Sequence, residues 1–233
     1  MICQEVFLRK KVELLLILLV IAGLIICSRH LTKYVLTDKV DTKKNTVVID
    51  AGHGGSDPGK VGVNDALEKD INLEIAKKVK KLLEKKGVNV IMTRESDEAL
   101  GDGSKGSRKV QDMRERVELI NKSKPELTVS IHQNSFHQAE VHGAQVFYFK
   151  HSAEGEKHAG IMQEILRTVD KGNTKEPKAD DTYYLLKKTE TPIIIIECGF
   201  LSNPEEAEKL TTKEYQKEMA EAITDGILAC LKD

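Results

Sequence analysis

The chain has 233 residues, of which 31% are charged, and its formal net charge is −1. This length allows one large domain or two small ones, and the balanced charge excludes the basic surface that nucleic-acid binding requires. Aromatic residues make up only 4% of the chain, with no tryptophan, so rings on which bases or sugars could stack are scarce. We therefore expect no nucleic-acid partner.

The N-terminus has the pattern of an export signal. Arg9-Lys10-Lys11 precedes an unbroken apolar run at 14–27, which is the order of a basic n-region and a hydrophobic h-region. The run is shorter than the about 20 residues of a membrane-spanning helix, yet no small-residue cleavage site follows it. Ile25 and Ile26 in front of Cys27 also argue against a lipoprotein. We expect an uncleaved membrane anchor, with cleavage and secretion as the alternative.

The predicted layout has three parts, namely a signal anchor at 1–30, a linker at 31–45 and a folded domain at 46–233. No internal repeat and no long Pro/Gly linker divides the third part, so we expect a single domain there. That domain lies outside the cytoplasm whether or not the anchor is cleaved.

Hydrophobic periodicity predicts alternating strands and helices along the domain. The predicted strands lie at 46–51, 88–93, 127–132, 144–149, near 183–187 and at 192–197. The predicted helices lie at 68–86, 109–122 and 154–170, and two more end the chain. This alternation predicts an α/β fold, a single three-layer domain with a mainly parallel twisted sheet covered by helices on both faces.

The two last helices carry start signals. Asn203 is expected to cap the first of them, with Pro204 in the first turn and Glu206 completing a capping box. Thr212 is expected to cap the final helix in the same way.

Three apolar strands deliver chemistry-bearing side chains at their carboxyl ends: His53, His132 and Glu197. In open α/β sheets this edge is where ligands bind. Glu197 follows four consecutive isoleucines, and a carboxylate at the end of a buried strand is a candidate for proton transfer. A plain buried ion pair is an equally open interpretation of Glu197 from this pattern alone.

Two histidines suit a zinc ion, which needs a further nitrogen or carboxylate ligand when it is catalytic. Glu68 is the best candidate, because it opens a predicted helix and shares a face with Asn72. A first-turn glutamate also complements the helix dipole, and the local pattern leaves that alternative open.

The motifs around these residues resemble a family. His53 in IDAGHGGSDPG, Glu68 in EKDIN, His132 in SIHQN and Glu197 in IECGFLSN resemble the motifs of the zinc-dependent N-acetylmuramoyl-L-alanine amidases of the third amidase type. Further residues fit the family pattern in the expected order: Arg94, Met113, Arg116 and Asn121. The resemblance covers residues 45–232. Within the family it is most similar to the short amidases with which spore formers prepare cortex peptidoglycan for germination.

The resemblance implies that His53, Glu68 and His132 bind one zinc ion and that Glu197 is catalytic. Zinc activates a water molecule by lowering its pKa, and Glu197 would carry the proton from that water to the departing amine. The bond cleaved would join the lactoyl group of N-acetylmuramic acid to L-alanine of the stem peptide. In a spore former the domain would act between the two spore membranes.

Two other functions compete with this one. A zinc peptidase or deacetylase acting on wall material is disfavoured because the usual HExxH helix is missing. A non-catalytic wall-binding protein should have lost Glu197 or a metal ligand, and neither is lost.

Some members of the family carry an insertion that blocks the zinc site until an activator binds. The stretch 134–143 is too short for such an occluding helix, and the chain has no wall-binding repeat. We therefore expect an open cleft, with peptidoglycan glycan strands and stem peptides as substrate. Targeting or activation would come from a partner protein or from homodimer formation.

The remaining candidates have plainer interpretations. Cys198 is expected to be a small buried residue and not a nucleophile. Asp50 either orients a metal ligand or serves a turn. Four further histidines are expected at the surface: His137, His142, His151 and His158.

Overall fold

The computed structural model describes residues 45–101 and 107–232. The expected anchor and nearly all of the expected linker therefore lie outside the described residues, and both stay predictions. Within the described part of the chain, no helix combines the length and the apolar character needed to cross a bilayer.

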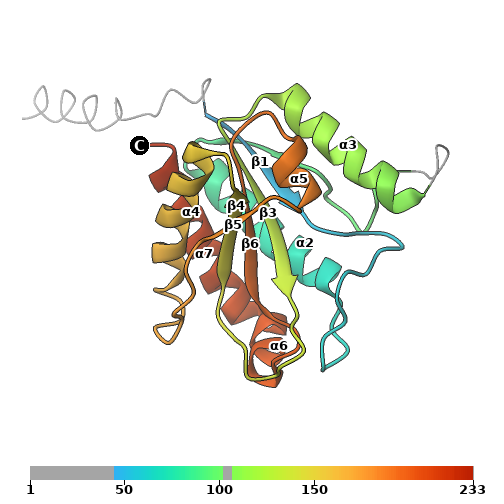
Figure 1. Cartoon of the computed structure of the whole chain (residues 1–233), viewed down its shortest axis with the longest axis vertical. Coiled ribbons are helices and arrows are strands. Elements are labelled where there is room, and N and C mark those ends of the chain that lie inside the picture. Colours follow the sequence, from blue (N-terminus) through green and yellow to red (C-terminus); the bar gives the residue numbers. More distant parts are fainter. Residues whose placement is uncertain (1–44, 102–106, 233) are drawn as a thin grey trace, which may run out of the picture. The chain divides into compact units, whose positions relative to one another are not determined.

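A six-stranded sheet forms the centre of the described domain (Figure 1). Its strands are β1 (Thr46–Ala51), β2 (Asn89–Met92), β3 (Leu127–Asn134), β4 (Gln145–Phe149), β5 (Lys178–Asp180) and β6 (Ile193–Phe200). The spatial order is β2-β1-β3-β6-β4-β5. β2, β1, β3 and β6 run parallel, whereas β4 pairs antiparallel with β6 and parallel with β5. The expected mainly parallel sheet is confirmed, with β4 and β5 at one edge running in the opposite direction.

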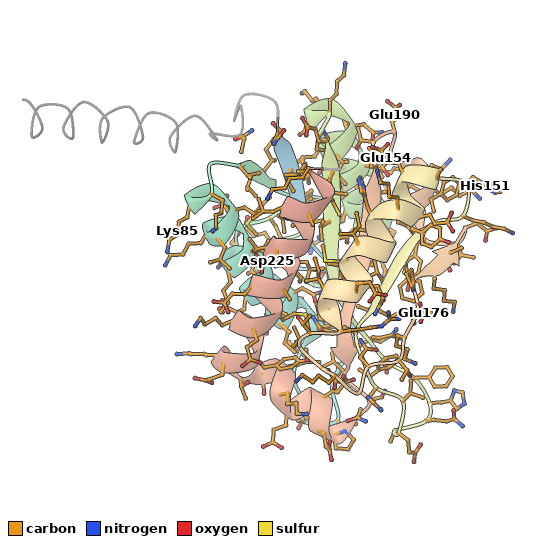
Figure 2. All side chains as sticks on the ribbon, turned by 90° about the vertical axis from the view of Figure 1, so that its left-hand side faces the viewer. Lys85, His151, Glu154, Glu176, Glu190 and Asp225 are labelled. Atoms are coloured by element: carbon orange, nitrogen blue, oxygen red, sulfur yellow. The ribbon has the colours of Figure 1, made fainter. Side chains whose placement is uncertain are left out.

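Helices cover both faces of this sheet, as expected. They are α2 (Glu68–Lys85), α3 (Arg108–Ser123), α4 (Ala153–Leu166), α5 (Tyr184–Lys188), α6 (Pro204–Thr211) and α7 (Lys213–Cys230). α7 packs against both α2 and α4 on one face, which Figure 2 shows toward the viewer. α3 and α5 contact each other on the opposite face.

The isoleucine run of β6 explains how one strand serves both faces. Successive side chains of a strand point to opposite sides of the sheet. Ile194 and Ile196 accordingly join the core beneath α2, α4 and α7, whereas Ile193 and Ile195 join the smaller core beneath α3 and α5. Glu197 comes directly after this doubly buried segment, so its position at the sheet edge is fixed by packing on both sides.

The strand predicted near 183–187 is wrong, because this segment forms α5 and the nearby strand is β5. Asp180 ends β5, and its carboxylate accepts hydrogen bonds from the backbone N–H groups of Thr182 and Tyr183. These bonds turn the chain out of the strand. The adjacent Leu185 and Leu186 are both buried and join the same core as Ile193 and Ile195.

The helix caps are confirmed in part. Asn203 caps α6 by accepting from the N–H of Glu206, and Thr212 caps α7 by accepting from that of Tyr215. The capping box is wrong, since the Glu206 carboxylate instead accepts from the N–H groups of Gly143 and Phe200. Glu206 thus links the start of β4 to the end of β6.

Candidate metal centre

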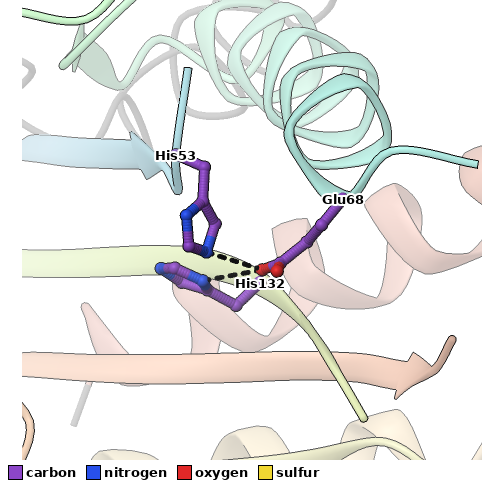
Figure 3. Close-up of side chains that lie close together, drawn as sticks. All are labelled: His53, Glu68 and His132. Atoms are coloured by element: carbon purple, nitrogen blue, oxygen red, sulfur yellow. Dashed lines mark hydrogen bonds and ion pairs between the residues drawn. The ribbon is translucent and has the colours of Figure 1, made fainter. Parts of the chain in front are cut away.

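The three residues predicted to bind zinc converge at the carboxyl edge of the sheet. His53 follows β1, Glu68 opens α2 and His132 lies in β3, which runs beside β1 in parallel register. Glu68 Oε1 lies 3.2 Å from His53 Nε2 and 2.9 Å from His132 Nδ1 (Figure 3). One ligand atom from each residue falls within 4.8 Å of the others, so the three groups could hold a metal ion.

Two glycines make this convergence possible. A Cβ atom on Gly52 would lie 2.3 Å from Cε1 of the His132 ring, and one on Gly59 would lie 2.5 Å from Glu68 Oε2. Gly59 also has a φ of 70°, which disfavours other residues. The glycines of the HGG motif region therefore leave the space that the ligand side chains occupy.

Glu68 is held as an anion. Its side chain is 2% exposed, and its oxygens accept from the N–H groups of Lys60 at 2.8 Å and Gln133 at 3.1 Å. Burial alone would raise the pKa of Glu68, but hydrogen bonds and charge from His132 and His53 outweigh it and hold the pKa far below its usual range. A group that only complements a helix dipole would face solvent, whereas this carboxylate faces both imidazoles.

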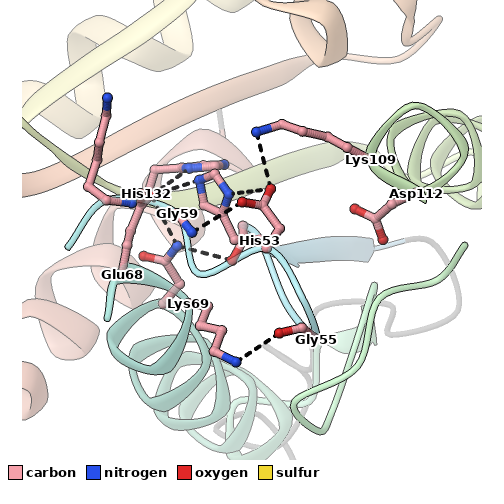
Figure 4. Close-up of polar contacts among 12 residues, drawn as sticks. His53, Gly55, Gly59, Glu68, Lys69, Lys109, Asp112 and His132 are labelled. Atoms are coloured by element: carbon pink, nitrogen blue, oxygen red, sulfur yellow. Dashed lines mark hydrogen bonds and ion pairs between the residues drawn. The ribbon is translucent and has the colours of Figure 1, made fainter. Parts of the chain in front are cut away.

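Asp57 is a site residue that the sequence analysis did not single out. Its Oδ2 lies 2.9 Å from His53 Nδ1 and 3.3 Å from Lys109 Nζ. Figure 4 shows His53 and Lys109, with dashed lines for the polar contacts around them. A carboxylate four residues after a histidine in a glycine-rich turn was the available signal. It was obscured because Asp and Gly are also the ordinary residues of turns.

Two buried arginines fix the turn that carries His53. Arg116 Nη2 donates to the carbonyl of His53 at 2.7 Å, and Arg94 Nη2 donates to that of Gly52 at 3.0 Å. Asp50 is fully buried and accepts from Arg116 Nη1 at 2.6 Å. Asp50 therefore acts on the turn that carries His53 through Arg116, which combines its two expected roles.

The other residues of the family pattern have different positions. Met113 lines the cleft described below. Asn121 instead bonds the backbone at Lys188 and Glu190, where it links α3 to the segment after α5.

Glu197 lies beside His132 in the parallel register of β6 and β3. It lines a cleft of about 370 Å³ with the three candidate ligands, and Lys60 and Lys109 add positive charge to its walls. Burial raises the pKa of Glu197 above its ordinary value; His132 opposes this and the charge of Glu68 adds to it. Its carboxylate does not belong to the cluster of three ligand groups.

Tyr183 is a second residue that the sequence analysis missed. Its hydroxyl donates to Glu197 Oε1 at 3.2 Å, and it lines the same cleft. Burial and the charge of Glu197 raise the pKa of Tyr183, so the phenol stays protonated and donates. Because the segment near 183–187 was expected to be a strand, the sequence analysis gave no sign that Tyr183 contacts Glu197.

The expectations for cysteine and histidine are mostly confirmed. Cys198 is completely buried, and burial raises the pKa of its thiol, which does not suit a nucleophile. Three of the four extra histidines are exposed: His137, His142 and His151. The prediction that His158 lies at the surface is wrong, because α4 turns its side chain inward and it is 7% exposed.

Comparison with known proteins settles the family. The family profile described as N-acetylmuramoyl-L-alanine amidase matches residues 47–229. The chain belongs to this family. The amidase is 45% identical over 185 residues to the germination-specific N-acetylmuramoyl-L-alanine amidase of Bacillus subtilis, covering 78% of each chain.

Solved structures agree with this assignment. The amidase superposes on the CwlD amidase of Clostridioides difficile, in complex with the GerS lipoprotein, with a TM-score of 0.78 and 41% identity, covering 81% of this chain and 99% of that one. For the amidase AmiC2 of Nostoc punctiforme the TM-score is 0.71 and the identity 33%, covering 81% and 98%. The expected α/β fold of the amidases is thus confirmed.

Proposed function

We propose that this amidase hydrolyses the bond between the lactoyl group of N-acetylmuramic acid and L-alanine of the stem peptide. In this proposal His53, Glu68 and His132 hold one zinc ion and Glu197 transfers protons. The observation that carries it is the meeting of two imidazoles and one anionic carboxylate in a cleft that Glu197 also lines.

The donor set fits zinc. Two histidines and one carboxylate are a known catalytic ligand set, which leaves a fourth position open. Two ligands bound 2.0–2.1 Å from a tetrahedral ion are about 3.3 Å apart, close to the 3.2 Å and 2.9 Å between Glu68 Oε1 and the two imidazole nitrogens. Asp57 leaves Nε2 of His53 available by bonding Nδ1.

Zinc, when bound, would lower the pKa of a water molecule and polarise the substrate carbonyl. Glu197 supplies the proton transfer in the proposal. Its carboxylate lines the cleft beside the three candidate ligands, where it would take a proton from water. The carboxyl group would then return the proton to the alanine amine, which cannot leave as an anion.

We place the activity in the spore cortex, where it would prepare peptidoglycan for germination. Support comes from the germination-specific relative and from the single-domain layout. The domain would act outside the cytoplasm, held by an N-terminal anchor, in the space between the spore membranes.

A protein partner is part of the proposal. The CwlD amidase of Clostridioides difficile was solved with the GerS lipoprotein. We propose that an activating or targeting partner, or a second copy of the chain, has a comparable role here.

The test is a digest of purified spore peptidoglycan analysed by mass spectrometry. Wild-type protein should release stem peptides with a free alanine amine, a chelator should abolish this, and added zinc should restore it. Glu197→Gln should keep zinc but lose at least ~10²-fold in turnover, whereas Glu190→Gln, at an exposed position, should match wild type.

Other results would redirect the proposal. Cleavage between amino acids of the stem would indicate a peptidase, and release of acetate would indicate a deacetylase. Near wild-type turnover by Glu197→Gln would refute the assigned role of Glu197.

A further inference from the structure

The two oxygens of the Glu197 carboxylate have different surroundings. Oε1 accepts from the Tyr183 hydroxyl at 3.2 Å, whereas Oε2 is buried with no partner. The side chain is held on a strand buried on both faces, so the backbone leaves it little freedom. The torsion that turns a carboxylate group is nevertheless soft, and a hydrogen bond to one oxygen decides where the other points.

Tyr183 is itself fixed from two directions. Asp180 Oδ1 accepts from the N–H of Tyr183 at 2.9 Å and from that of Thr182 at 2.6 Å, which sets the chain entering α5. The ring packs against Phe147 of β4 with ring centroids 5.5 Å apart. The backbone hydrogen bond and the ring contact together therefore hold the Tyr183 hydroxyl in place.

We propose that Tyr183 is a positioning residue for Glu197, because its hydrogen bond to Oε1 fixes how the carboxylate is turned toward the reacting water and amine. The inference rests on the proposed function, in which Glu197 transfers the proton. Among the described residues, no other side chain hydrogen-bonds this carboxylate.

The role predicts a specific kinetic effect. Proton transfer requires the acceptor oxygen within hydrogen-bond reach of the proton, and a misplacement of about 1 Å costs on the order of 10²-fold in rate. Without the phenol, the carboxylate can rotate or bond a stray water molecule. Because the contacts to substrate and metal remain, removing the hydroxyl should lower kcat and leave KM unchanged.

Tyr183→Phe removes the hydroxyl and keeps the ring that packs on Phe147. We expect kcat to fall about tenfold or more, with KM, zinc affinity and melting temperature unchanged. Tyr148→Phe is the matched control, because Tyr148 also donates to a glutamate, Glu156, at 3.2 Å on the far side of β4. This control should match wild type in all four quantities.

Asp180→Ala provides a second variant. It keeps the Tyr183 hydroxyl but removes the carboxylate that bonds the backbone N–H groups of Thr182 and Tyr183. We expect a smaller fall in kcat in the same direction. A wild-type kcat for Tyr183→Phe, or a loss confined to KM or to melting temperature, would overturn the inference.

Glu197→Gln separates this inference from the proposed function. If Glu197→Gln is inactive while Tyr183→Phe is fully active, only the positioning role fails. If Glu197→Gln remains active, the proposed mechanism fails first, and the positioning role fails with it.

Discussion

Asp57 Oδ2 lies 2.9 Å from Nδ1 of His53, and this contact determines which nitrogen of the ring faces Glu68. Burial would raise the pKa of Asp57, but the hydrogen bond and charge of His53 outweigh it and lower the pKa. An ionised carboxylate only accepts hydrogen bonds, so Nδ1 carries the proton. The contact thereby turns Nε2 of the ring toward Glu68 and the candidate metal centre.

Replacing Asp57 should therefore weaken metal binding without removing a ligand. We expect Asp57→Asn to lower zinc affinity about tenfold to 100-fold, as for other groups that orient metal-bound histidines. Zinc titration with a competing chelator dye measures this. Asp97→Asn is the control, since Asp97 bonds the same turn at Gly55 but no ligand ring. Equal affinities for the two variants would contradict the prediction.

Zinc should stabilise the folded domain through Glu68. A ligand that binds only the folded state adds about 2.7 kcal/mol at a concentration 100 times its Kd. The melting temperature of the wild type should rise with zinc and fall with a chelator, and Glu68→Gln should lose most of this response. Glu74→Gln, an exposed position of the same helix, should respond like wild type. A full zinc response in Glu68→Gln would remove Glu68 from the ligand set.

The buried pair of Asp50 and Arg116 predicts a pH dependence of stability. Burial raises the pKa of Asp50, but Arg116 and neighbouring hydroxyl groups outweigh it and lower the pKa from 3.8 to about 2. A lowered pKa stabilises the fold above about pH 4, and the contribution is lost as the pH falls through 2. The shift corresponds to about 2 kcal/mol at neutral pH.

Urea unfolding of Asp50→Asn and wild type measures this contribution. The difference in unfolding free energy should narrow by about 1 kcal/mol between pH 6 and pH 3. Asp225→Asn, at an exposed position, should match wild type at both values. A difference that stays constant with pH would show that Asp50 has an ordinary pKa.

The N-terminal segment should hold the protein at a membrane. We expect the intact chain in the membrane fraction of the producing cell, and Leu19→Arg should release it, because a charge within the apolar run opposes insertion. Surface protease should digest the domain from the outer side. N-terminal sequencing that finds a mature form beginning after residue 27 would show cleavage instead.

The sequence predicted the convergence of His53 and His132 because strand ends in a parallel sheet meet at one edge. That argument needs only strand order and periodicity. The sequence could not predict that Asp50 reaches His53 through Arg116. Asp50 and Arg116 are 66 residues apart, and they meet only when α3 packs on the sheet. A contact of this kind depends on tertiary packing and not on local pattern.

The two failures have different physical causes. Tyr183, Leu185 and Leu186 have the apolar character of a short strand, but the local turn at Asp180 leads the chain out of β5 and into α5. Glu206 is at the position that a capping box requires, yet its carboxylate accepts hydrogen bonds from the backbone N–H groups of Gly143 and Phe200. For Glu206, tertiary packing overrides a local preference.

The reversed direction of β4 has a consequence for protein engineering. Because β4 runs opposite to β3, the segment 135–144 leaves the sheet and re-enters it at the same edge, passing the end of β6. Hydrogen bonds from Phe136 N to Ser202 Oγ and from Gly143 N to Glu206 Oε1 fasten it near each end. A module inserted between those two points would leave the strand register intact and would follow closely on Ser135, which lines the cleft. This amidase therefore offers a position where a synthetic insertion would disturb the sheet little.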